Sequence, residues 1–133
     1  MMYHKDGSLP PPGNEWIWVF GSNLAGRHGM GAALVAKRAY GALYGCANGP
    51  MGLSYAIPTK GFHLDTLSLE HIQRYVREFK RYAAITDQQF FVTSVGCGLA
   101  GYKPADIAPM FAHSPMNCSF PDTWRDILEE IGT

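Results

Sequence analysis

Residues 16–31, with the sequence WIWVFGSNLAGRHGMG, decide the fold class of this chain. The first five, Trp16–Phe20, are aromatic and β-branched residues without a charge, a pattern typical of a buried β-strand. The eleven residues Gly21–Gly31 contain four glycines. The small residues that follow predict a helix over Ala32–Leu43. A strand that passes through a glycine-rich loop into a helix is the repeating unit of an α/β fold.

Further strands and helices alternate along the chain. Ser54–Ile57 is a second short strand, which we expect Pro58 to stop. Apolar side chains then recur at spacings of three and four, which predicts an amphipathic helix over residues 69–84 with Ser68 as its N-cap. A third strand, Gln89–Ser94, leads into a second glycine-rich loop.

The last third of the chain completes the pattern. Pro104 is expected to begin a helix that continues over Ala105–His113. Cys118–Phe120 is a candidate strand, and a final helix is predicted from about Pro121 to Ile131. The alternation predicts an α/β domain with a mostly parallel sheet and helices on its faces.

The domain is predicted to span residues 16–133. An extended lead-in precedes it over residues 1–15, which contain three consecutive prolines. The domain is therefore expected to be short at its N-terminus.

Composition narrows the class of protein. The chain has 133 residues, with 11 Lys plus Arg against 11 Asp plus Glu, which disfavours a polybasic nucleic-acid or membrane-surface binder. No segment approaches the ~20 apolar residues of a membrane span, and the start lacks the apolar core of a signal peptide. The three cysteines and five histidines lack zinc-binding spacings. We therefore expect a cytoplasmic protein in a reducing compartment, with no membrane partner, no metal and no cofactor.

The two glycine-rich loops suggest where a ligand binds. Ligands of α/β sheets bind outside the carboxyl ends of the strands, and both loops follow strands there, beside Pro58-Thr59-Lys60. Glycine lets backbone N–H groups approach a ligand, and a helix N-terminus favours an anion. Neither loop matches the Walker A motif or the dinucleotide fingerprint GxGxxG. Two such loops favour a phosphate-containing ligand over a purely structural role.

Three segments carry a resemblance to a known family. Asn23–Ala33 (NLAGRHGMGAA) resembles the first ligand loop of macrodomains. Tyr55–Lys60 (YAIPTK) resembles the strand–Pro-Thr-Lys segment of the branch that holds the DarG-type DNA ADP-ribosyl glycohydrolases and the terminal ADP-ribose protein glycohydrolases. Val95–Leu99 (VGCGL) is similar to the second loop of that branch. The order of the three segments agrees with the family from about Trp16 to Ser119. The resemblance implies a macrodomain-like, three-layer α/β/α fold with a mixed, mostly parallel sheet.

The resemblance implies that ADP-ribose or a related nucleotide binds with its diphosphate between the two loops. Asn23 would face the distal ribose, and Lys60 falls where the branch keeps its functional lysine. The implied ligand-binding residues are Asn23, Gly29, Met30, Gly31, Thr59, Gly96, Cys97, Gly98, Leu99, Ala100, Gly101 and Tyr102.

The function implied is hydrolysis of an ADP-ribose conjugate on DNA or protein. A lysine beside C1″ of the ribose can attack that carbon and form a Schiff base with the opened sugar, or act through its charge. Attack requires the neutral amine, hence burial or a cationic neighbour. The chain departs from the protein glycohydrolases at Ala100, where they carry Asp. It also lacks, before Trp16, a match to the macrodomain Asp that takes the adenine amino group, although Asp6 is available.

Three other functions compete with hydrolysis of a conjugate. The first is binding or sequestration of ADP-ribose or a signal nucleotide without turnover, and the second is processing of ADP-ribose-1″-phosphate. The third is a generic nucleotide-binding α/β domain. Among individual residues, we expect His28 to be solvated, Tyr102 either to pack or to stack on the ligand, and Cys97 not to act as a catalytic thiol. Four basic residues of the long helix, Arg74, Arg77, Lys80 and Arg81, are expected to form one solvated face or to guide a nucleic-acid substrate.

Overall fold

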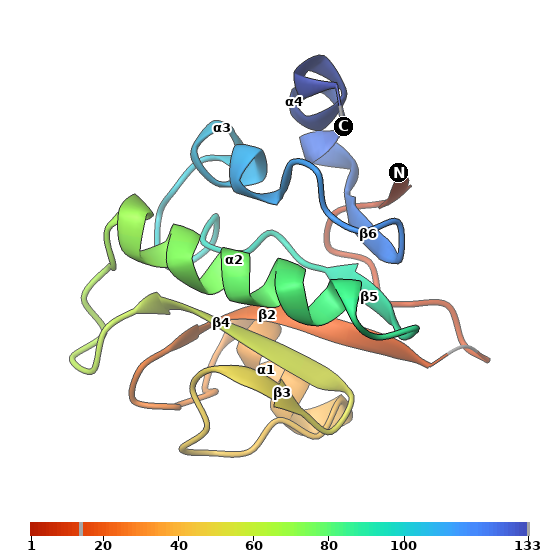
Figure 1. Ribbon diagram of the computed structural model, residues 1–133. Helices are drawn as coiled ribbons and strands as arrows, with labels where there is room; N and C mark the ends of the chain where they lie inside the picture. Colours follow the sequence, from red (N-terminus) through yellow and green to blue (C-terminus); the bar gives the residue numbers. More distant parts are fainter. Residues whose placement is uncertain (14, 133) are drawn as a thin grey trace.

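A six-stranded sheet organises residues 1–13 and 15–132, which the computed structural model describes (Figure 1). The strand order is β1-β6-β5-β2-β4-β3. Neighbouring strands are parallel except β3, which is antiparallel to β4. The predicted α/β class and mixed, mostly parallel sheet are therefore confirmed. The strands are β1 Met2–His4, β2 Trp16–Asn23, β3 Gly49–Met51, β4 Ser54–Lys60, β5 Gln89–Val92 and β6 Cys118–Pro121.

Helices lie on both sides of this sheet, in agreement with three layers. Helix α1 packs behind it in Figure 1, and α2 crosses its front. None of the helices in the described residues is long and apolar enough to cross a membrane. The helices are α1 Gly31–Ala39, α2 Leu69–Ala84, α3 Pro104–Ile107 and α4 Arg125–Ile131, with 3₁₀ turns over Ala108–Phe111 and Asp122–Trp124.

Helix α2 has the predicted bounds and the predicted cap. The Ser68 hydroxyl accepts a hydrogen bond from the His71 N–H at 3.2 Å. Ile72, Val76 and Phe79 are fully buried, at the spacing of one helix face. Edge-to-face contacts join Phe79 to the rings of Tyr55, Phe90 and Phe111, with centroids 5.1, 5.3 and 6.0 Å apart. This aromatic cluster is the centre of the larger half of the core.

Two of the predicted boundaries are wrong near prolines. Strand β4 continues through Pro58 to Lys60. Pro58 lies beyond Ala56, the last residue of β4 that β3 pairs, and next to a bulge between β2 and β4, where a missing ladder N–H is tolerated. Helix α3 starts at Pro104 as predicted but ends at Ile107, and a 3₁₀ turn containing Pro109 replaces the rest of the predicted helix.

Other element ends also differ by a few residues. Strand β2 continues past Phe20 to Asn23, and helix α1 begins at Gly31 and already ends at Ala39. Strand β5 ends at Val92, two residues early, and α4 begins at Arg125 after a 3₁₀ turn. These differences lie at termini, where the hydrophobic pattern carries the least information.

The lead-in contains a strand that the sequence did not predict. Strand β1 pairs in parallel with β6, with Tyr3 opposite Phe120. The His4 ring stacks on Phe91 with centroids 3.7 Å apart, and its Nδ1 lies 2.8 Å from the Ser119 hydroxyl. A three-residue strand has no detectable periodicity, so its pairing with a segment more than 110 residues away is a tertiary effect.

Candidate functional site

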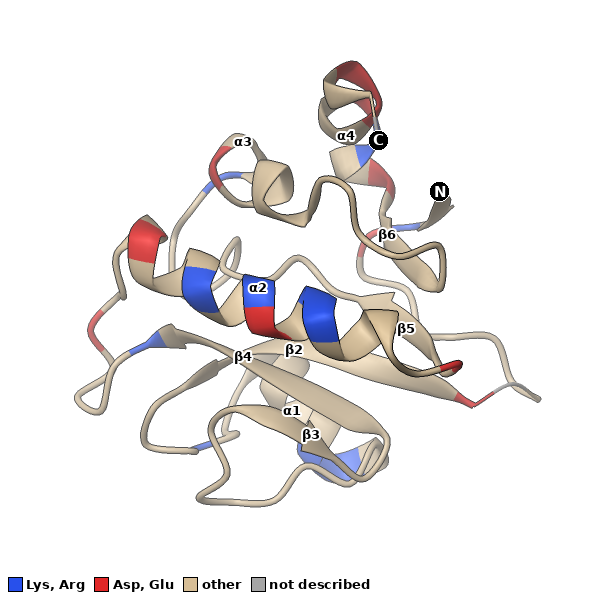
Figure 2. Cartoon of the chain, viewed as in Figure 1, with Lys and Arg blue, Asp and Glu red and all other residues tan. Residues whose placement is uncertain are grey.

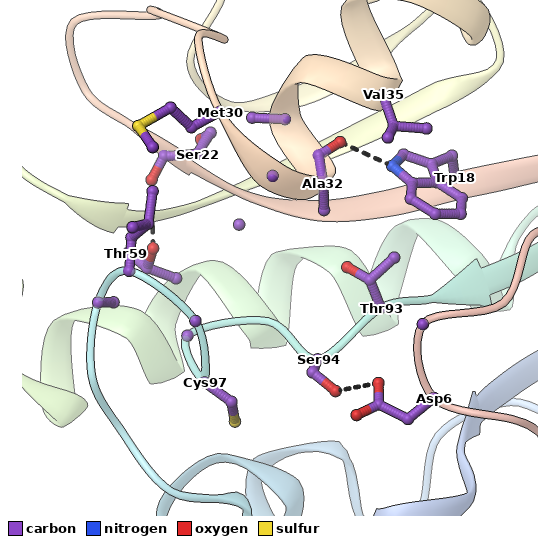
Figure 3. A pocket seen from close by; sticks show the side chains of 18 of the residues that line it. Asp6, Trp18, Ser22, Met30, Ala32, Val35, Thr59, Thr93, Ser94 and Cys97 are labelled. Atoms are coloured by element: carbon purple, nitrogen blue, oxygen red, sulfur yellow. Dashed lines mark hydrogen bonds between the residues drawn. The ribbon is translucent and has the colours of Figure 1, made fainter.

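A cavity of about 950 Å³ opens at the carboxyl ends of β2, β4 and β5 (Figure 3). Its walls come from the first loop (residues 24–30), the second loop (residues 93–103), the end of β4 and the lead-in. Lys60 and most of the implied ligand-binding residues line it, whereas Gly101 and Tyr102 do not. The implied residues that do are Asn23, Gly29, Met30, Gly31, Thr59, Gly96, Cys97, Gly98, Leu99 and Ala100.

The first loop is closed by Asn23. Its side-chain oxygen accepts the Arg27 N–H at 3.0 Å, and its amide nitrogen donates to the Arg27 carbonyl at 2.8 Å. Asn23 therefore holds the loop in shape while it borders the cavity. It is also the cross-strand partner of Lys60.

His28 is buried, so the expectation of a solvated side chain is wrong. Only 1% of the residue is exposed, and its Nε2 lies 2.9 Å from the Leu43 carbonyl oxygen. Its ring meets Phe20 edge to face, with centroids 5.4 Å apart. His28 turns inward at a point where the segment after α1 supplies the Leu43 carbonyl as a hydrogen-bond acceptor. The residues next to His28 in the sequence give no sign of this distant partner.

Residues 43–47, which we call the brace, support the first loop from behind. The Gly45 N–H donates to the Gly26 carbonyl at 2.9 Å, and the Ser22 hydroxyl donates to the Ala47 carbonyl. Gly26 has φ +70° and lies so close to the brace that a Cβ would collide with the Gly45 backbone. The first loop thus depends on a distant segment.

The second loop is held by hydrogen bonds over short sequence distances. The Cys97 N–H donates to the Ser94 carbonyl at 3.0 Å, and the Tyr102 N–H to the Gly96 carbonyl at 2.9 Å. Gly96 has φ +74°. Tyr102 packs rather than lining the cavity, and its hydroxyl donates to the Leu67 carbonyl at 2.6 Å.

Three successive backbone donors of the second loop remain available to a ligand. In the part of the chain that the structure describes, the N–H groups of Gly98, Leu99 and Ala100 donate to no protein acceptor. All three residues border the cavity. Successive free N–H groups in such a loop form a concave site for an anion.

At two positions the fold itself does not require glycine. The fifteen glycines all lie in the described ranges, and most have a positive φ or a close neighbour. Gly29 and Gly98 have neither: no φ in the left-handed region, and nothing within 4 Å of a Cβ built on them. Both line the cavity, one in each loop, so a side chain at either position would extend into open space at the cavity wall.

Lys60 lies at the cavity end of β4. It is partly buried, and its backbone carbonyl accepts the Leu24 N–H at 2.9 Å. Within the described residues the structure records no hydrogen bond or ion pair of its ammonium group. The other charged residues that line the cavity are Asp6 and Arg27. The Lys60 charge is therefore available to a bound ligand.

Asp6 is a site residue that sequence reasoning did not place. Its Oδ1 accepts a hydrogen bond from the Ser94 hydroxyl at 2.7 Å, across the cavity from Met30 and Thr59 in Figure 3. Its backbone N–H donates to an Asp122 carboxylate oxygen at 3.1 Å. Strand β1 carries Asp6 to this position, so detecting it required the pairing of β1 with β6.

The floor near Asp6 is aromatic. Trp18 and Phe91 stack with centroids 5.7 Å apart, and the Trp18 Nε1–H donates to the Ala32 carbonyl at 3.0 Å. Both rings line the cavity, together with Val35 of α1. The faces of the two rings are covered by Tyr40, by His4 and by each other, so this end of the cavity is an apolar wall, whereas the other end offers backbone donors and Lys60.

Cys97 is a neutral thiol in the cavity wall. Burial, followed by the negative charges of Asp6 and Asp106, raises the pKa of Cys97 to about 11. A thiol with this pKa is protonated near neutral pH, which opposes a nucleophilic role. In the described residues no cluster of three or more His, Cys, Asp or Glu side chains could hold a metal ion.

The basic residues of α2 divide into two groups. Arg74, Arg77 and Arg81 are exposed along the helix, interrupted by Glu78 (Figure 2). Lys80 instead turns inward and donates to the carbonyls of Met110 and Ala112 at 3.2 and 2.7 Å. Because Lys80 turns inward, the expected four-residue basic face is reduced to three arginines. Burial also lowers the pKa of Lys80.

Comparisons with protein-family models, curated proteins and solved structures found no match to this chain.

Proposed function

We propose that this protein binds ADP-ribose, or a closely related nucleotide diphosphate, between its two loops and hydrolyses an ADP-ribose conjugate. The observation that carries the proposal is the pair Gly29 and Gly98, which the fold does not require and which border the cavity from opposite loops. Close approach of a ligand to the backbone explains glycine at both positions.

The cavity supports one orientation of such a ligand. The free N–H groups of residues 98–100 would bind the diphosphate, because they supply an uncharged, concave set of donors. The base would lie at the apolar end of the cavity beside Trp18 and Phe91, where the second oxygen of the Asp6 carboxylate can accept an amino group. The distal ribose would then lie near Asn23 and Lys60.

Lys60 is the reactive group in this proposal. As the neutral amine, its nitrogen attacks C1″ and displaces the conjugated group, whose leaving atom takes the proton that the lysine nitrogen gives up. In the resulting glycosylamine the C1″–O4″ bond breaks, O4″ takes up a proton from solvent, and the nitrogen lone pair forms the C1″=N bond of a Schiff base. Water hydrolyses this bond to free ADP-ribose and regenerate the amine. As the ammonium, Lys60 would instead stabilise charge on the leaving group. Trapping with borohydride separates the two routes, because reduction makes only the first a permanent adduct.

Calorimetric titration with ADP-ribose, using AMP and NAD as comparison ligands, tests binding. Gly29→Val and Gly98→Val should each lower the affinity for ADP-ribose at least tenfold, with little change in thermal stability, since the added groups enter open space. Ala39→Val, which adds similar bulk at the exposed end of α1, is the matched control. Unchanged affinity in both glycine variants would remove the loops from the binding site.

Turnover is tested with Lys60→Ala on ADP-ribosylated DNA and protein. We expect hydrolysis to be abolished while the affinity for ADP-ribose stays within a few-fold. Lys37→Ala, an exposed lysine of α1, is the control.

Binding without turnover is the second candidate function. Two observations favour it. Among the described residues, no group is recorded beside the Lys60 ammonium that could take up its proton. Ala100 offers no carboxylate beside the second loop. Tight binding of ADP-ribose by a wild-type protein that hydrolyses no conjugate would establish a sequestering or reader role.

A further inference from the structure

His28 occupies an unusual position for a polar side chain. It is fully enclosed, yet only one of its two ring nitrogens has a hydrogen-bond partner: within the described residues, Nδ1 is buried and unpaired. The partner of Nε2 is the Leu43 carbonyl oxygen at 2.9 Å. A carbonyl only accepts, so the proton of the neutral ring is on Nε2.

Packing alone does not explain a histidine here. The ring lies edge to face against the fully buried Phe20, a contact that a phenylalanine could also make. Burial of an unpaired ring nitrogen costs free energy that an apolar ring would not. The feature specific to histidine is the directional hydrogen bond from Nε2 to the brace.

That hydrogen bond controls the part of the first loop that faces the cavity. His28 lies between Arg27, whose N–H and carbonyl are both held by Asn23, and Gly29, which borders the cavity. The backbone from residue 27 to residue 29 is therefore fixed on one side by Asn23 and on the other by the His28 ring.

We propose that His28 is a positioning residue for the ligand-binding loop: its Nε2–H bond to Leu43 sets the backbone at Gly29. This inference rests on the proposed binding of ADP-ribose between the loops. It assigns His28 no contact with the ligand, because the residue does not line the cavity. Under this proposal the brace contributes to binding without touching the ligand, because it holds His28.

Three substitutions separate the hydrogen bond from packing. His28→Phe keeps a ring and removes the donor. His28→Gln retains an amide N–H at about the reach of Nε2, whereas the shorter His28→Asn can place its amide only near Nδ1. If the donor matters, Gln preserves function, and Phe and Asn do not.

Two measurements on the full chain report the outcome. The first is the rate of trypsin cleavage after Arg27 in the ligand-free protein, followed by mass spectrometry, with Asn23→Ala as the variant expected to open the loop. The second is the affinity for ADP-ribose, measured by calorimetry at a temperature where circular dichroism shows each variant to be folded. A general loss of stability does not change affinity under that condition, so the second measurement is specific to positioning.

We expect His28→Phe and His28→Asn to be cleaved after Arg27 at least fivefold faster and to bind ADP-ribose about tenfold more weakly, with His28→Gln close to wild type in both. The proposal is overturned if the Phe variant behaves as wild type, or if Gln and Phe lose affinity equally. Should the Phe variant fail to fold, the comparison of Gln with Asn decides in the same way. A wild-type protein that does not bind ADP-ribose would refute the proposed function, while the cleavage rates would still show whether Nε2 positions the loop.

Discussion

The two loops that face each other across the cavity are stabilised in different ways. Both loops contain local hydrogen bonds, but the backbone of the first is also bonded to the brace through Gly26 and Gly45, and His28 adds a bond to Leu43. Over residues 94–102 of the second loop the backbone hydrogen bonds are local, and side-chain hydrogen bonds join this segment to distant ones. The comparison shows that similar glycine-rich sequences can differ in whether their backbone bonds to itself or to a distant segment.

The largest expected effect comes from breaking the tertiary support directly. Gly26→Ala and Gly101→Ala both place a Cβ at a positive φ, +70° and +86°, which costs on the order of 1 kcal/mol. At Gly26 the Cβ also collides with the Gly45 backbone, whereas at Gly101 nothing lies within 4 Å. We expect a loss of about 2–4 kcal/mol in unfolding free energy for Gly26→Ala and about 1 kcal/mol for Gly101→Ala.

Urea denaturation of the two alanine variants measures this difference. Equal losses of unfolding free energy would mean that the brace shifts to accommodate the added Cβ at no energetic cost. The first loop would then be no more dependent on tertiary contacts than the second.

A smaller effect is expected where the Tyr102 hydroxyl joins the second loop to a distant segment. Tyr102→Phe removes the hydroxyl that donates to Leu67 at 2.6 Å, which should cost about 1 kcal/mol of unfolding free energy. The turns within the loop remain, so the affinity for ADP-ribose should change less than twofold. A loss of affinity as large as that expected for His28→Phe would show that the second loop also relies on distant support.

The smallest effect concerns His4, whose strand carries Asp6 to Ser94 beside the second loop. Burial lowers the pKa of His4 in the folded protein. Below about pH 6.5 the unfolded chain therefore binds more protons than the folded one, so the unfolding free energy falls as the pH drops from there toward the lowered pKa. Because the ring is only partly buried, solvent screening limits the loss to a few tenths of a kcal/mol.

Denaturation curves of wild type and His4→Gln between pH 5 and pH 8 isolate this contribution. The wild type should lose stability relative to the variant on the acid side alone. A parallel pH dependence of the two proteins would contradict the assignment.

Elements with strong local signals could be predicted from the sequence. Helix α2 has the bounds and the Ser68 cap that apolar spacing indicated, and α3 starts at Pro104. These features depend on side chains within one or two helical turns. The end of β4 could not be predicted. Pro58 is tolerated in this strand because β3 pairs β4 only as far as Ala56 and because the ladder between β2 and β4 has a bulge next to Pro58.

The same division applies to the candidate site. Gly29, Gly31, Gly96, Gly98, Thr59 and Lys60 were predicted from their place after strands and from the family resemblance, and the structure places them around one cavity, whereas Gly101 lies outside it. The sequence did not place Asp6 or His28. The position of Asp6 depends on a three-residue edge strand, and that of His28 depends on its hydrogen bond to the brace.

The sequence alone determined the α/β class, the order of the main strands and helices, and the presence of glycine-rich loops at strand ends, because periodicity and backbone freedom are local properties. Only the tertiary structure decided that the lead-in supplies a strand, that His28 is buried and that Asp6 borders the cavity. These features arise from pairing and packing between distant segments, whose free energy no local pattern records.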